Sequence, residues 1–171
     1  YYDAYAFCLG CYTLSYKGFM IQILPDSLSF LNQYTTLFAA VGAIFNLIFT
    51  NIFLQTKKNL RPFYYLNILG MLFFSSAIIA YCTIDSQAGT EIVQASIIFS
   101  VIVMIVCSSM ILRKGFKPAR FFLLAFTLAF LSYTIHVFHF QGIIQDSMLV
   151  NNTVVIGTVT EMLLLLLAIG D

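Results

Sequence analysis

The chain has 171 residues, of which 61% are apolar and only 9% are charged, and its net charge is +1. An average soluble domain carries about 25% charged residues, so these few ionisable side chains cannot cover a globule of this size in water. The composition therefore argues against a soluble enzyme, a disordered segment and a nucleic-acid-binding protein. It predicts a membrane protein with little mass outside the bilayer.

The apolar residues form six long stretches separated by polar and Pro/Gly clusters. A membrane helix needs about 20 mostly apolar residues to cross roughly 30 Å of hydrocarbon. We predict spans near 3–23, 30–54, 63–84, 90–112, 119–141 and 149–170. The predicted fold is all-α: a polytopic bundle of six transmembrane helices forming a single domain over 1–171. Because the connections are short, consecutive helices are expected to be antiparallel neighbours.

The first two spans carry polar and aromatic markers. Lys17 lies near the end of the first span, where its long side chain can reach the headgroups. Asn46 and Asn51 lie in the second span, and hydrogen bonds to a neighbouring helix are the default interpretation of both. Tyrosine rings typical of the headgroup level begin the first span, at Tyr1, Tyr2 and Tyr5.

Pairs of small residues four positions apart occur in the second, third and fifth spans, where they favour close packing of helices: Ala39/Ala43, Ser76/Ala80 and Ala125/Ala129.

The charged residues divide the connections into two kinds. Acidic residues and no Lys or Arg occur in or beside the first, third and fifth connections, at Asp26, Asp85, Glu91 and Asp146. Seven of the eight basic residues lie in or beside the second and fourth connections: Lys57, Lys58, Arg61, Arg113, Lys114, Lys117 and Arg120. Basic connections stay in the cytoplasm. We therefore predict that these connections and both ends of the chain face the cytoplasm, where the basic residues meet anionic lipid.

The fifth span contains two histidines, His136 and His139, on one helical face toward its outer half. Such a pair could contribute to a metal site only with a third ligand from another segment, for example Asp85, Glu91 or Asp146. The commoner alternative is a hydrated pair near the headgroups that carries no metal. We predict no metal, and no motif in the chain predicts a cofactor or a catalytic residue.

The sixth span contains Glu161, the deepest ionisable residue of the chain. An ionisable group at this depth is costly, which makes a functional role the default hypothesis: a proton or ion ligand, or a buried hydrogen-bonding switch. The structural alternative is a Glu that faces the bundle interior and pairs with Asn46, Tyr133 or Thr127. Gly157 lies one turn earlier on the same face, where it could permit a close crossing or a hinge.

Three segments resemble one receptor family. Residues 113–126, RKGFKPARFFLLAF, are similar to the R-x-G-x-x-P-A-R-x-F-L-L-A element in the seven-transmembrane domain of bacterial receptors with diverse intracellular signalling modules. Phe49-x-x-x-Phe53-Leu54-x-Thr56-Lys57-Lys58 with Pro62, and Gly157-x-x-x-Glu161-x-Leu163-Leu164 through Ala168 and Asp171, resemble its third-helix end and its last helix. Six spans then correspond to helices two to seven, so the first helix is expected to be missing from a fragment of a longer receptor.

The resemblance implies a function and partners. Such receptors carry a periplasmic ligand-binding domain before the bundle and a kinase, cyclase or phosphatase module after it, in the bacterial inner membrane. We therefore expect a non-catalytic domain that relays a periplasmic signal to a cytoplasmic output module. The domain is expected to lie in the lipid bilayer, and it could form a homodimer. The relay candidates are Glu161, Gly157, Asn46 and Tyr133. The alternative is a small transporter or channel that uses Glu161 and His136/His139.

Overall fold

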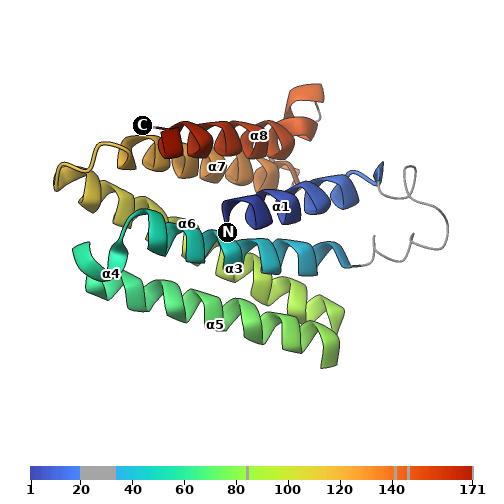
Figure 1. The fold of residues 1–171 in the computed structure, drawn as a ribbon. Helices are drawn as coiled ribbons and strands as arrows, with labels where there is room; N and C mark the ends of the chain where they lie inside the picture. Colours follow the sequence, from blue (N-terminus) through green and yellow to red (C-terminus); the bar gives the residue numbers. More distant parts are fainter. Residues whose placement is uncertain (20–33, 84, 141, 146, 171) are drawn as a thin grey trace. The chain divides into compact units, whose positions relative to one another are not determined.

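The computed structural model describes residues 1–19, 34–83, 85–140, 142–145 and 147–170, except for the side chains at 136, 137, 140 and 151. These residues form α-helices joined by turns (Figure 1), so the predicted all-helical class is confirmed. The chain divides into two compact units, 1–100 and 101–171, and the long helix α6 contributes to both. Each unit is described separately below.

The first unit contains α1 (Tyr2–Tyr16), α3 (Thr35–Phe53), α4 (Thr56–Asn59), α5 (Arg61–Thr83) and the first part of α6 (Ser86–Arg113). Helix α1 packs against α3, and α3 packs against α5 (Figure 1). The ring centroids of Tyr2 and Phe49 are 5.5 Å apart. This contact places the start of α1 beside the end of α3, so the two helices are antiparallel.

Helix α1 ends earlier than the span predicted over 3–23. The last helical residue is Tyr16, and Gly18 follows in the left-handed region at φ 72°. Lys17 and Gly18 give the reason, because a left-handed glycine after a polar residue is a common way for a helix to end. The remainder of the predicted span, from 20 to 23, lies outside the described residues, as does the start of the second span at 30–33.

The second unit contains the end of α6 with α7 (Ala119–Phe140) and α8 (Met148–Gly170). Helices α7 and α8 run side by side over most of their length (Figure 1). Among the described side chains of α7, the buried ones are Ala119, Phe122, Ala125 and Phe126. Their spacing of three or four residues puts them on one helical face, as expected for a helix that packs on one side only.

Four described helical segments are long and apolar enough to cross a membrane: 35–53, 61–83, 86–113 and 152–170. A fifth apolar segment, 119–135, is shorter. A helical membrane domain therefore agrees with the structure, whereas the full count of six spans stays a prediction. The observed helices lie within a few residues of the six predicted stretches wherever these fall on described residues.

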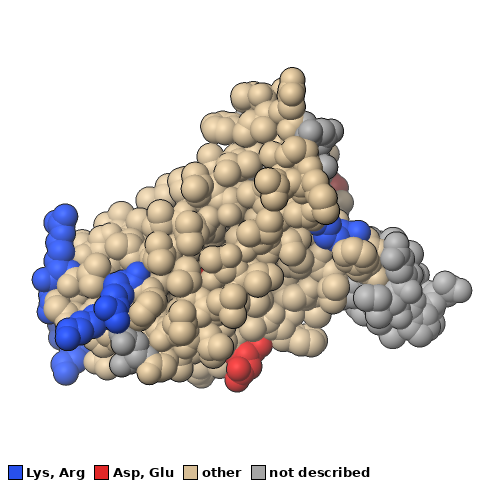
Figure 2. All heavy atoms as spheres, turned by 90° about the horizontal axis from the view of Figure 1, so that it is seen from above, with Lys and Arg blue, Asp and Glu red and all other residues tan. Residues whose placement is uncertain are grey.

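The exposed surface is largely apolar, as expected for a protein surrounded by a bilayer. Large apolar side chains such as Leu72, Ile79, Leu131 and Leu163 are more than half exposed. Most of the described surface in view in Figure 2 consists of residues other than Lys, Arg, Asp and Glu (tan). Such apolar exposure would be unfavourable in water, but in a bilayer these side chains contact lipid chains.

Candidate functional site

Helix α8 buries one stripe of side chains, and a carboxyl group lies within it. The buried residues of α8 are Gly157, Glu161, Leu165 and Ala168. Steps of four, four and three residues place all of them on one face. Glu161 is only 7% exposed. Glu161 and Gly157 therefore lie on one buried face of α8, and the roles predicted for them stay predictions.

The backbones of α7 and α8 approach closely at Gly157. A Cβ atom added there would lie 2.5 Å from both Cβ and Oγ of Ser132 on α7. That separation is well inside van der Waals contact, so only glycine fits at position 157 without a shift of one helix. Close crossings at glycine are the usual means by which membrane helices gain packing energy, because apolar burial gives little drive inside lipid. Glu161 follows one turn beyond this crossing.

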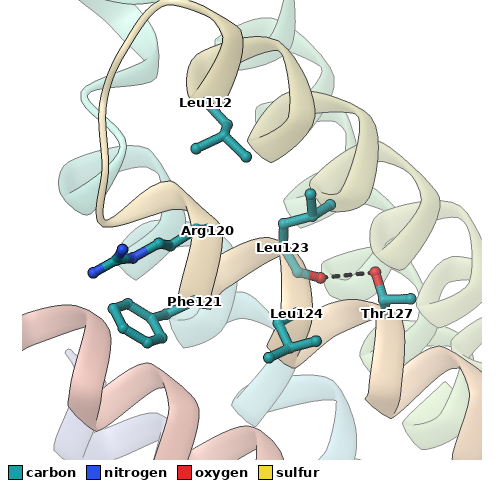
Figure 3. A pocket seen from close by; sticks show the side chains of 6 residues that line it. All are labelled: Leu112, Arg120, Phe121, Leu123, Leu124 and Thr127. Carbon is teal, nitrogen blue, oxygen red and sulfur yellow. Dashed lines mark hydrogen bonds between the residues drawn. The ribbon is translucent and has the colours of Figure 1, made fainter.

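The three predicted partners of Glu161 occupy different environments. Tyr133 follows Ser132 on α7 and is half-buried. Thr127 is exposed, and its hydroxyl donates to the carbonyl of Leu123 at 2.7 Å (Figure 3). Asn46 is buried in the other compact unit, where the hydroxyl of Thr50 donates to its backbone carbonyl at 2.8 Å. Which of them pairs with Glu161 stays a prediction.

A hydrogen-bonded polar cluster joins α3, α4 and α5 at the basic end of the first unit. Asn67 Nδ2 donates to Asn51 Oδ1 at 2.7 Å, and Thr56 Oγ1 donates to the same oxygen at 2.7 Å. Asn67 and Thr56 are fully buried. The expected interhelical hydrogen bond of Asn51 is thus present. Its partner Asn67 was not predicted, although a lone Asn in an otherwise apolar span was a usable signal.

The predicted basic residues are exposed at the ends of helices. Lys57 and Lys58 lie on α4, and Arg61 begins α5. The other four are also exposed, in or beside the connection from α6 to α7: Arg113, Lys114, Lys117 and Arg120. Within the first unit, Lys57 and Asp85 lie at opposite ends of α5, whose 23 residues span about 34 Å. Within the first unit, the structure therefore separates the second connection from the third by about the length of a membrane span, whereas Asp26 and Asp146 lie outside the described residues.

The two histidines that were considered as metal ligands belong to the last turns of α7. His139 is half-buried in the last turn of that helix, and the side chain of His136 lies outside the described residues. No group of three or more His, Cys, Asp or Glu side chains within the described part of the chain is placed to hold a metal ion. The arrangement thus offers a tight helix crossing, a buried carboxyl and a polar cluster as its distinctive features.

Comparison with known families identifies one that covers the whole chain. The model of the family described as "7TM diverse intracellular signalling" matches residues 1–171. Comparisons with curated proteins and with solved structures give no match. The match includes all three segments on which the resemblance was based.

Proposed function

The chain belongs to the 7TM diverse intracellular signalling family, and on that premise we propose that it is a non-catalytic transmembrane relay of a bacterial receptor. A ligand event in the periplasm shifts the helices between two packings, and α8 passes the shift to a cytoplasmic output module in the same polypeptide. The output is of the kinase, cyclase or phosphatase type. The bacterial inner membrane is its site of action.

The proposed topology has six spans, corresponding to helices two to seven of the family, with both chain ends on the cytoplasmic side. The start of α1 lies beside the end of α3 through the Tyr2–Phe49 contact, next to the basic α4. The hydroxyls of Thr36 and Thr90 share a hydrogen bond at 3.2 Å, which places the start of α3 beside the start of α6 at the acidic end. Both contacts support an alternation of basic and acidic ends. Basic ends in the cytoplasm follow the positive-inside rule.

The observation that carries the relay is the pairing of a tight crossing with a buried carboxyl on α8. A relay needs an element with two arrangements and a contact that differs between them. Gly157 leaves α8 close to Ser132 without an interlocking side chain. Glu161, 7% exposed, then supplies the polar contact. Because a carboxyl in lipid is costly unless hydrogen-bonded, its partners bias which packing is populated.

The test removes the acidic function of Glu161 while keeping its size. In the full-length protein in native membranes, Glu161→Gln is expected to change the basal activity of the output module about fivefold or more, the range typical of allosteric coupling. The measurement is the specific activity of that module at equal amounts of inserted protein. Glu91→Gln is the matched control, because Glu91 is exposed and accepts a hydrogen bond from Gln87 at 3.2 Å.

Unchanged output in Glu161→Gln would refute the role of this carboxyl in the relay. An equal change in Glu91→Gln would also refute it, because an exposed carboxyl would then have the same effect on output as the buried one.

The family match does not favour the alternative of a small transporter or channel built on Glu161 and His136/His139.

A further inference from the structure

Beside the basic connection of the second unit, α7 carries an open hollow. It encloses about 450 Å³ and is lined by Leu112, Arg120, Phe121, Leu123, Leu124 and Thr127 (Figure 3). All six residues belong to the second unit. The hollow begins at the first turn of α7 and extends for about two turns, which is about 10 Å along the helix.

The lining is apolar except at one end. Thr127 directs its hydroxyl to the carbonyl of Leu123, so its polar atom is already bonded within the helix. Leu124 is 48% exposed and belongs to the surface of the protein. In a bilayer, the apolar part of such a surface hollow is filled by lipid, because close packing of apolar groups is favourable and apolar side chains do not hold water.

Arg120 marks the other end of the hollow. Its guanidinium carbon lies 4.6 Å from the centre of the Phe121 ring, a cation–π geometry that orients the group (Figure 3). The planar guanidinium matches two phosphate oxygens. Exposed positions on α7 form a stripe of Arg120, Leu124, Thr127 and Leu131, so one helical face changes from cationic at its end to apolar further in.

The charged residues that adjoin this hollow along the sequence are all basic. Arg113, Lys114 and Lys117 are exposed in the adjoining connection, and residues 92–145 contain no Asp or Glu. Anionic headgroups are attracted to such a cluster, with about a fivefold gain in binding for each basic residue. A ligand for this place therefore needs a phosphate and an apolar chain in one molecule.

We propose that this hollow is a binding site for one anionic phospholipid, with the phosphate on Arg120 and an acyl chain along Leu124 and Thr127. Lys117 and its neighbours attract the headgroup. The site requires only that α7 lies in a bilayer, and it is independent of the relay and of the side on which the chain ends lie.

The test measures lipid binding to the full-length protein, purified in detergent, by native mass spectrometry. Phosphatidylglycerol and phosphatidylcholine with identical acyl chains are the probes. We expect phosphatidylglycerol to bind more tightly, and Arg120→Gln to weaken its binding about fivefold. Lys58→Gln is the matched control, because it removes the same charge from an exposed position on α4. Equal affinity for the two lipids, or equal weakening by both variants, would overturn the site.

A second pair of variants tests the acyl chain. Thr127→Phe fills the hollow and is expected to weaken phosphatidylglycerol binding severalfold. Thr134→Phe is its control, because Thr134 lies two turns further on the same helix, outside the lining, with its hydroxyl likewise bonded to a backbone carbonyl, that of Phe130. Unchanged binding in Thr127→Phe would overturn the chain site. Displacement of the lipid by soluble glycerol phosphate would indicate a site for free phosphate and would also overturn the proposal.

Discussion

At Gly157 the absence of a side chain allows α7 and α8 to cross. Gly157→Ala is expected to lower the free energy of unfolding by about 1–3 kcal/mol, because the added methyl group meets Ser132 and one helix must shift. The measurement is the thermal unfolding midpoint of the purified full-length protein in detergent. A midpoint equal to that of the wild type would contradict the close crossing.

Two variants separate packing from helix propensity at this crossing. Gly10→Ala in α1 adds a methyl group with no atom of the described residues outside its own helix within 4 Å, so no loss of stability is expected. Ser132→Gly combined with Gly157→Ala moves the missing side chain to the opposite helix, and it should recover part of the stability lost in Gly157→Ala. A similar loss in Gly10→Ala would indicate a general effect of the substitution.

For individual residues, the sequence predicted Glu161 and Gly157 better than it predicted the residues that contact them. Glu161 and Gly157 were predictable because a carboxyl deep in an apolar span is rare and because four residues make about one helical turn. Ser132 could not be predicted, since small polar residues are common in such spans. For Asn67 the residue type was a usable signal, but its partner was not predictable, because the buried face of an apolar helix is not encoded by alternation when lipid and protein are equally apolar.

At the scale of helices, length and hydropathy predicted the positions of the elements, whereas contacts between them were less predictable. The start of α5 at Arg61–Pro62 fits the preference of proline for the first helical turn. Of the predicted small-residue pairs, Ser76/Ala80 does not form a packing face, because Ser76 is exposed. Close approaches occur instead at glycines, as where a Cβ on Gly70 would lie 3.2 Å from Leu47.

The neighbourhood of α3 and α6 gives a prediction at this scale. The Thr36 and Thr90 hydroxyls are 3.2 Å apart, so cysteines at these positions are expected to bring their sulfur atoms close enough to be linked by oxidation. With the four natural cysteines replaced by alanine, Thr36→Cys/Thr90→Cys is expected to form this bond under mild oxidation. Mass spectrometry of the proteolysed protein would detect the linked peptides.

The control pair is Thr36→Cys/Ser76→Cys. Ser76 is exposed on α5 with its hydroxyl donated to the carbonyl of Phe73, and it is expected to give no linked peptide. Efficient linkage of the control pair would mean that reactivity does not report the packing of α3 against α6.

At the scale of the whole molecule, the sign of the charge at each connection leads to a labelling prediction. A charged thiol reagent added to intact cells should label Ser86→Cys at the acidic start of α6 and should spare Lys57→Cys and Lys117→Cys. Both lysines should react once the membrane is opened. The basis is the positive-inside rule and the separation of Lys57 from Ser86 by the length of α5. Opposite behaviour of Lys57 and Lys117 would refute the predicted topology.

For the whole molecule, composition alone predicted a membrane protein made of helices. The division into units at residue 100 was not predicted, because α6 crosses it as one uninterrupted apolar helix. Hydropathy detects where a helix ends, but a boundary between compact units inside a helix leaves no polar or glycine-rich signal in the chain.

The amide pair of Asn51 and Asn67 bears on how the protein enters the membrane during synthesis. Each amide alone would carry both of its polar groups into hydrocarbon without a partner, whereas the two together share a hydrogen bond of 2.7 Å, although Asn67 Oδ1 has no partner among the described residues. Helices α3 and α5 are consecutive long helices separated only by the short α4. They are therefore suited to leave the translocation machinery as a preformed hairpin, with each helix lowering the insertion cost of the other.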